Sequence, residues 1–317
     1  MNKKPFLTPT LLVLFSFALV LLHINAAAQT KETHSFVERD STLYLDVHKP
    51  AVQRADKAAV LAVFGGGFFT GKRDDAYQSA LADSLVERGF TVISIDYRLG
   101  MKDSLMVAEN SKLMKLDRLF QYCIDIATED CAAAVAWTVS HAQELDIDPG
   151  KIILTGSSAG AITVLQLDYC RTNQLPQASV LPEGWKPAAV IPYAGGIMCR
   201  KRDLRYGSDP APTLLLHGMK DKIVAYKRFG IPTHAKLFGS KTLDKVMKRQ
   251  GIPHWFIRFD GIGHEVASWF PGSVDLFCCF VDQCLAGRVS SLDANMSDSQ
   301  LQPTKWTNMS VFELYNR

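Results

Sequence analysis

The 317-residue chain is 47% hydrophobic and carries a formal net charge of +3, so it can bury a large core and has no strong charge excess. A protein that binds a polyanion usually carries a clustered basic surplus. The basic runs at 200–202 and 245–249 are short and suit solvated surfaces, so no nucleic-acid partner is expected.

Residues 1–28 have the pattern of a secretory signal peptide. Lys3 and Lys4 precede an almost unbroken apolar run over 11–24, and Ala26–Ala28 follow it. Positive, apolar and small residues in this order are typical of such a peptide, and a membrane span needs a longer run of ~20 residues. We therefore expect cleavage near Ala28, export to the periplasm or medium, and no stable membrane anchor on the nearly neutral mature chain.

From residue 58 onward, short apolar runs alternate with helical patterns, as in a parallel sheet with crossover helices. Before them, the alternation over 35–47 predicts an antiparallel strand or hairpin. The predicted strands are 59–64, 91–97, 151–155, 188–193, 213–217 and 255–259, and the predicted helices are 77–88, 124–144, 161–170, 242–250 and 273–285. This pattern predicts one α/β domain over 29–289, with a mostly parallel central sheet and helices on both faces.

Four stretches depart from this alternation. Residues 99–122, 171–186 and 225–241 are expected to be insertions over the carboxyl edge of the sheet. Residues 290–317 form a polar tail in which apolar residues return from Trp306 onward, so we expect the tail to dock on the domain.

Neither the cysteines nor the histidines have the spacing of metal ligands. The seven Cys are odd in number and several lie in apolar segments, so most are expected to be buried free thiols. The zinc signature His-Glu-x-x-His is absent. We therefore expect no metal site and no cofactor.

The strongest chemical signal is Gly-Ser-Ser-Ala-Gly at 156–160, which follows a predicted strand and opens a predicted helix. A G-x-S-x-G turn in this context presents a serine hydroxyl to a base and a substrate. Ser158 has a glycine two residues away on either side and is the predicted nucleophile, with Ser157 as the alternative. The five-residue match alone also fits an ordinary strand-to-helix turn.

Two later positions supply partners for this serine. Asp221 follows the predicted strand 213–217, and His264 follows the strand 255–259. The order Ser158, Asp221, His264 is that of a hydrolase triad on an α/β sheet, with His264 as general base and Asp221 as the acid that orients it. The alternatives are Asp260 or Glu265 for the acid, and His254 or His217 for the base.

A third signal is Phe-Gly-Gly-Gly-Phe at 64–68, where a predicted strand ends. Glycines leave backbone N–H groups open to a developing oxyanion. We predict that Gly66 or Gly67 joins the N–H of Ala159 in an oxyanion hole, although a flexible loop would also contain glycines.

With these motifs the chain resembles the carboxylesterase and feruloyl or acetylxylan esterase branch of the α/β-hydrolases. The matching segments, in order, are 64–68, 96–98, 148–160, 217–221 and 263–264. The resemblance covers about residues 35–287 and implies the α/β-hydrolase fold, with 96–98 as a structural turn. One position departs from the pattern, because Phe64 stands where this loop usually begins with a His that braces it.

The expected function is hydrolysis of carboxylic esters through an acyl-enzyme. Small esters or acylated carbohydrates are the expected substrates, and the resemblance and the export signal together suggest acyl groups of plant polysaccharides. A peptidase or amidase with the same triad is the first alternative. A non-catalytic binding protein that keeps the fold is the second.

Overall fold

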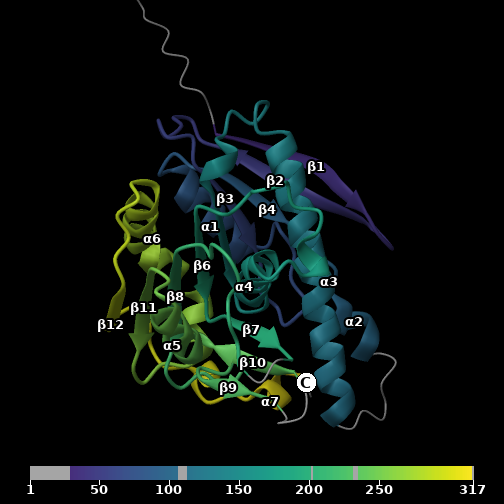
Figure 1. Ribbon diagram of the computed structural model, residues 1–317, viewed down its shortest axis with the longest axis vertical. Helices are drawn as coiled ribbons and strands as arrows, with labels where there is room; N and C mark the ends of the chain where they lie inside the picture. Colours follow the sequence, from purple (N-terminus) through teal and green to yellow (C-terminus); the bar gives the residue numbers. More distant parts are fainter. Residues whose placement is uncertain (1–28, 106–112, 201–202, 231–234, 316–317) are drawn as a thin grey trace, which may run out of the picture.

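A computed structural model of the protein describes residues 29–105, 113–200, 203–230 and 235–315 (Figure 1). The predicted signal peptide, residues 1–28, lies outside the described residues. Within the described ranges the main sheet has nine strands. In spatial order they are β1 (Thr30–Glu38), β2 (Thr42–Lys49), β4 (Thr91–Ile95), β3 (Ala59–Val63), β5 (Ile152–Ser157), β6 (Ala189–Tyr193), β8 (Thr213–Gly218), β11 (His254–Phe259) and β12 (Leu292–Met296).

The sheet is mostly parallel, as predicted. Only the first two pairings, β1 with β2 and β2 with β4, are antiparallel, and the pairs from β4 to β12 are parallel. Every residue of β3, β4, β5, β6 and β8 is buried. These strands therefore appear in the sequence as continuous apolar runs, because both of their faces are covered. The antiparallel hairpin predicted near residues 35–47 is β1 and β2.

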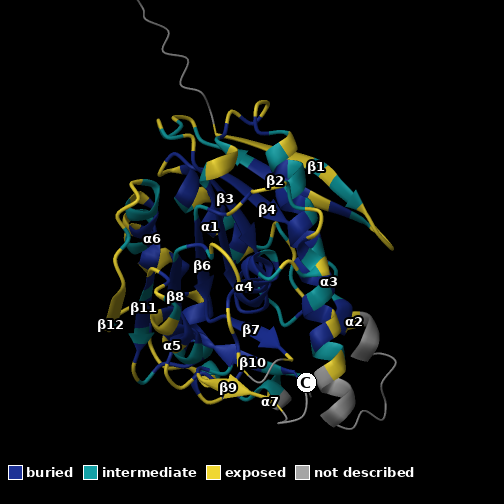
Figure 2. Cartoon of the chain, in the orientation of Figure 1, coloured by how far each residue is buried: buried dark blue, intermediate teal, exposed yellow. Residues whose placement is uncertain are grey.

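Helices cover both faces of the sheet, and each face has its own core. The first core includes residues of α3 (Leu113–Ser140), α4 (Ala159–Thr172) and α5 (Ser240–Gln250), and the second includes residues of α1 (Ala76–Val86) and α6 (Phe270–Leu285). Successive residues of β3 serve opposite cores, with Leu61 in the first and Val60 in the second. Figure 2 shows the buried strands between these layers, with exposed positions on β1 and β12.

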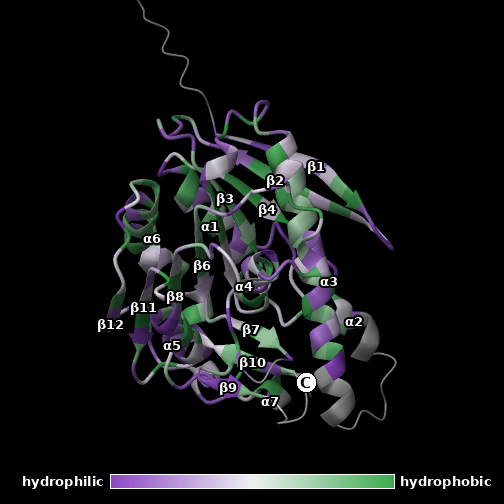
Figure 3. Cartoon of the chain, viewed as in Figure 1, coloured by the Kyte–Doolittle hydropathy of each residue, from purple (hydrophilic) through white to green (hydrophobic). Residues whose placement is uncertain are grey.

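Helix α4 lies deepest, and every residue of it except Arg171 is buried. A helix with an apolar surface all round is stable only when other elements enclose it. Helix α3 packs against α4 and carries hydrophobic and hydrophilic patches along its length, as expected of an outer helix (Figure 3).

The stretches predicted to be insertions contain regular structure. Residues 99–122 include α2 (Gly100–Leu105) and the first turns of α3, which begins well before its predicted start. Residues 225–241 contain β9 (Arg228–Phe229) and β10 (Lys236–Gly239), which form a separate antiparallel sheet with β7 (Gly196–Cys199). The stretch 171–186 has one 3-10 turn at Pro176–Ala178, and further 3-10 turns lie at Pro149–Lys151 and His264–Ser268.

The segment after residue 290 contributes to the sheet. Strand β12 pairs in parallel with β11, from Leu292 beside Trp255 to Met296 beside Phe259. A 3-10 turn (Lys305–Thr307) and a short helix α7 (Val311–Tyr315) then bring the chain back toward the site described below. Among the described helices, none combines the length and apolar character that a membrane crossing requires.

Candidate active site

Ser158 lies on a sharp turn between β5 and α4. Its backbone has φ of 51° and ψ of −112°, in a region that residues with a side chain rarely adopt. A Cβ atom on Gly156 would lie 2.5 Å from the backbone of Gly160, and one on Gly160 would lie 2.1 Å from the carbonyl oxygen of Val63. Close packing of strand, turn and helix therefore requires both glycines and holds Ser158 in this strained conformation.

The structure brings the three predicted triad residues into one hydrogen-bonded chain. The Oγ atom of Ser158 lies 2.8 Å from Nε2 of His264, and Nδ1 of His264 lies 2.8 Å from Oδ2 of Asp221. In the tautomer that satisfies both contacts, Nδ1–H donates to the carboxylate and Nε2 accepts from the serine hydroxyl. This arrangement can remove a proton from Ser158 and stabilise the imidazolium that forms.

Asp221 is fixed by further contacts at the end of β8. Its Oδ1 atom accepts hydrogen bonds from the N–H groups of Ile223 at 2.9 Å and Val224 at 3.0 Å. The Nε2 atom of His217 lies 3.3 Å from Oδ2. Burial alone would raise the pKa of Asp221, but the charges and hydrogen bonds of His264 and His217 outweigh it and lower that pKa. Asp221 is therefore held as a carboxylate.

Most of the alternative candidates lie apart from this hydrogen-bonded chain. His217 contacts Asp221, but its Nδ1 atom lies 2.7 Å from the hydroxyl of Ser240 and not at Ser158. The hydroxyl of Ser157 donates to the carbonyl oxygen of Ala267 at 2.6 Å. Asp260 is exposed and accepts from the adjacent N–H of Gly261. His254 begins β11 and therefore lies at the opposite edge of the sheet from the end of that strand, where its Nε2 is 3.2 Å from Asp244.

Glu265, the other alternative acid, has a different set of partners. One carboxylate oxygen accepts from the N–H of Gly263 at 2.8 Å. The other accepts from the N–H and hydroxyl of Thr304 at 2.8 and 2.7 Å and from the hydroxyl of Thr307 at 2.5 Å. Burial would raise the pKa of Glu265, but the hydrogen bonds from Thr307 and Thr304 lower it. In the sequence, the only signal at Glu265 was its position next to His264, which did not predict these contacts.

The glycine loop lines a pocket of about 380 Å³ beside the serine. Gly65, Gly66 and Gly67 contribute to its lining together with Ser158 and His264. Gly66 and Gly67 have φ values of 116° and 65°, which glycine adopts without strain. Ala159 is the first residue of α4, so its N–H has no acceptor within the helix. The predicted oxyanion donors therefore lie on the glycine loop and at the first residue of α4, both beside Ser158.

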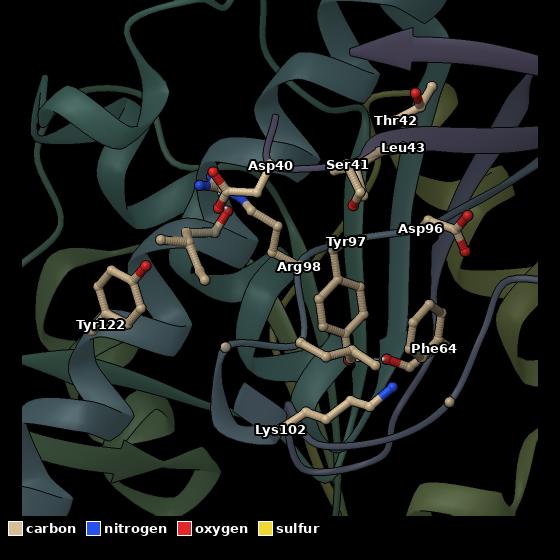
Figure 4. Close-up of a pocket in the computed structure, with 14 residues that line it drawn as sticks. Asp40, Ser41, Thr42, Leu43, Phe64, Asp96, Tyr97, Arg98, Lys102 and Tyr122 are labelled. Atoms are coloured by element: carbon tan, nitrogen blue, oxygen red, sulfur yellow. Dashed lines mark hydrogen bonds between the residues drawn. The ribbon is translucent and has the colours of Figure 1, made fainter. Parts of the chain in front are cut away.

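The start of the glycine loop is supported by aromatic packing. The rings of Phe64 and Tyr97 stack with centroids 4.4 Å apart, and the Tyr97 hydroxyl donates to the carbonyl oxygen of Phe64 at 3.1 Å (Figure 4). The side chain of Arg98 donates to Asp130 at 2.9 Å. The segment 96–98 thus fills the structural role that the resemblance implied, and it lines a second pocket of about 400 Å³ together with Phe64.

Nowhere in the described ranges do three or more His, Cys, Asp or Glu side chains gather as a metal site. Cys123, Cys131 and Cys170 are buried free thiols, and burial raises their pKa values. Of the thiols in α6, Cys279 is exposed, whereas Cys278 and Cys284 are partly buried.

Comparison with protein families identifies the first part of the chain. The model described as "Carboxylesterase family" matches residues 23–186, just over half of the chain. The chain belongs to the carboxylesterase family. The matched part includes the glycine loop and the turn at Ser158, and it ends before Asp221 and His264.

Two curated relatives of this carboxylesterase-family chain are similar over parts of their length. Lipase 2 of Moraxella sp. (strain TA144) is 32% identical over 105 residues, which is 33% of this chain and 20% of the lipase. The arylesterase of Saccharolobus solfataricus is 29% identical over 170 residues, which is 53% of this chain and 46% of the arylesterase. The chain thus matches less than half the length of each.

Solved structures confirm the predicted α/β-hydrolase fold. The propionate-bound esterase 2 of Thermogutta terrifontis superposes with a TM-score of 0.56 at 19% sequence identity, over 81% of this chain and 95% of that chain. A structure described as arylesterase gives a TM-score of 0.53 at 18% identity, over 80% of this chain and 85% of the other. At these identities the likeness shows the fold.

Proposed function

We propose that this protein hydrolyses carboxylic esters through a covalent acyl-enzyme on Ser158. The observation that carries the proposal is the hydrogen-bonded chain from Ser158 to His264 to Asp221, with 2.8 Å at each step. Membership of the carboxylesterase family and similarity to a lipase and an arylesterase support an ester as the substrate.

In the first half of the reaction, Ser158 forms the acyl-enzyme. Its Oγ atom bonds to the carbonyl carbon while its proton passes to Nε2 of His264, and Asp221 stabilises the resulting imidazolium. The carbonyl oxygen becomes an oxyanion and accepts hydrogen bonds from the N–H groups of Ala159 and of Gly66 or Gly67. The bond from carbon to the alcohol oxygen then breaks, and His264 returns the proton to the departing alcohol.

In the second half, water releases the acyl group. His264 takes a proton from a water molecule whose oxygen bonds to the acyl carbon, and the same N–H groups stabilise the second oxyanion. The bond between carbon and Oγ of Ser158 breaks, the serine regains its proton from His264, and a carboxylic acid leaves. Both halves use the same three side chains, so the enzyme returns to its starting state.

The proposed substrates are small esters and acylated carbohydrates, including acyl groups of plant polysaccharides. The pocket volume of about 380 Å³ and the lining by Phe69, Trp306 and Leu314 favour a compact acyl or alcohol group with apolar surface. We further propose that the protein works after export, which the pattern of residues 1–28 suggests.

The test compares Ser158→Ala with Ser157→Ala on p-nitrophenyl esters of increasing acyl length, with p-nitroanilides as amide analogues. Loss of the nucleophile should lower kcat by about 10⁶-fold. Ser157→Ala is the matched control, because its hydroxyl binds the carbonyl oxygen of Ala267, and it should stay within about tenfold of wild type.

Two results would contradict the proposal. One is a folded wild-type protein that cleaves none of these esters, and the other is full activity in Ser158→Ala. Cleavage of the anilides without cleavage of the esters would indicate that the protein is an amidase or peptidase that uses the same triad. Acetylated and feruloylated polysaccharides then test the carbohydrate substrates.

A further inference from the structure

The C-terminal segment, residues 304–315, reaches the loops that carry the proposed acid and base. Ser310 pairs as an isolated parallel bridge with Lys222, the residue after Asp221. Thr304 and Thr307 donate three hydrogen bonds to Glu265, the residue after His264. The segment is therefore anchored beside both residues, and its contact from Thr307 to Glu265 is buried, so breaking it costs free energy.

The segment also reaches the glycine loop. The hydroxyl of Tyr315 donates to the carbonyl oxygen of Gly67 at 2.7 Å. The contact is close, because a Cβ atom added to Gly67 would lie 2.9 Å from that hydroxyl. Tyr315 is partly buried and lines the pocket beside Ser158. Burial raises the pKa of Tyr315, so the phenol remains protonated and available as a donor.

Hydrogen bonds fix two consecutive peptide planes of the loop. The carbonyl oxygen of Gly66 accepts from the N–H groups of Phe69 and Thr70, each at 3.1 Å. Because the peptide is planar and trans, this contact directs the N–H of Gly67 the opposite way. The next plane, from Gly67 to Phe68, is the one that Tyr315 holds. Glycine is free to rotate about both backbone bonds, so Gly67 depends on the contacts on its two sides.

We propose that Tyr315 is a positioning residue for the oxyanion hole, holding the Gly67 backbone in the orientation that stabilises the oxyanion. The inference rests on the proposed ester hydrolysis. Tyr97 supports the start of the loop through the carbonyl oxygen of Phe64 (Figure 4), and Tyr315 supports it at Gly67. The C-terminal segment thus forms part of the catalytic pocket.

The test is Tyr315→Phe in the full chain, since this change removes the hydroxyl and keeps the ring. The value of kcat/KM should fall about tenfold, less than the roughly 10²–10³-fold that follows loss of an oxyanion donor itself. A trifluoromethyl ketone, which forms an anionic hemiketal with Ser158, should bind more weakly by the same factor. Tyr44→Phe is the control, because Tyr44 is exposed on β2 and lines neither this pocket nor the second pocket at Phe64.

The outcomes separate this inference from the proposed function. Equal loss in kcat/KM and in ketone affinity for Tyr315→Phe alone supports the positioning role. Wild-type values in Tyr315→Phe would overturn that role while ester hydrolysis stands. A loss in kcat/KM with unchanged ketone affinity would also overturn the positioning role. That result would mean that the Tyr315 hydroxyl contacts the substrate as part of the pocket wall and does not affect the oxyanion. If the wild type neither cleaves esters nor reacts with a fluorophosphonate probe, the proposed function itself fails.

Discussion

Glu265 offers a test of how the C-terminal segment is attached, through the substitution Glu265→Gln. A glutamine can present one oxygen to Thr304 and Thr307, but its NH2 group then faces the N–H of Gly263. The charge-assisted hydrogen bond from the N–H of Gly263 is lost, and this N–H then faces the NH2 group, which is also a donor. We expect the free energy of unfolding at neutral pH to fall by about 2 kcal/mol, the usual size for a hydrogen bond to a charged group.

The loss should depend on pH in a defined direction. The hydrogen bonds of Glu265 lower its pKa below the ordinary value of 4.5, so the ionised group stabilises the folded state at pH values above 4.5. This stabilisation disappears as the pH falls through the pKa of the folded state. Glutamine does not ionise, so the difference between wild type and variant should be largest near neutrality and shrink on acidification.

Urea unfolding of both proteins at about pH 7 and about pH 4 measures this difference. Glu144→Gln is the matched control, because Glu144 is exposed and should show no change at either pH. The reasoning is refuted if Glu265→Gln matches the wild type at neutral pH. It is equally refuted if the loss stays constant as the pH falls, since a neutral packing defect would behave in that way.

Two further substitutions test the acid and the turn. Asp221→Asn should keep the fold, because an amide oxygen can still accept a hydrogen bond from the N–H of Ile223. The value of kcat on p-nitrophenyl acetate should fall by about 10⁴-fold, because the imidazole of His264 loses the carboxylate that orients it. Activity within tenfold of wild type would refute the assigned role. Gly160→Ala should lower the midpoint of thermal unfolding by several degrees, because the added Cβ would lie 2.1 Å from the carbonyl oxygen of Val63. Gly150→Ala is the control in the same thermal melt. Its Cβ would meet only a flexible carboxylate at 3.3 Å, so the midpoint should not change.

Strands and helices with apolar surfaces could be predicted from the sequence, because burial on both faces leaves a signal in each segment. The strands β3, β4, β5, β6, β8 and β11 lie within a few residues of their predicted positions. Parallel strands also place their carboxyl ends at one edge, so Ser158, Asp221 and His264 could be expected to meet there. Their spatial meeting is a consequence of the fold that the sequence pattern predicts.

Elements without such a signal were missed. Strand β12 has the sequence Leu-Asp-Ala-Asn-Met and an exposed pattern at all but one position, so no alternation marks it. It forms through pairing with β11. The small sheet of β7, β9 and β10 likewise depends on contacts between residues far apart in the chain, such as Lys236 with Cys199.

The choice between neighbouring candidates also required three-dimensional contacts. Ser157 and Ser158 are adjacent, and only the backbone turn directs one hydroxyl to His264 and the other to Ala267. Glu265 stands beside His264 in the sequence, yet its carboxylate binds the C-terminal segment. The identity and spacing of the residues thus indicated a triad. The direction of each side chain then decided which of the neighbouring candidates belongs to it.

The family match ends at residue 186, so it includes the proposed nucleophile and the glycine loop but neither the acid nor the base. The C-terminal segment lies still further beyond it and contacts all three loops, through Lys222, Glu265 and Gly67. The C-terminal segment carries no catalytic motif, yet it contacts the loops that hold the proposed acid, the proposed base and the glycines of the oxyanion hole. Because Trp306 and Leu314 of this segment also line the pocket, changes there should alter acyl preference without touching the triad.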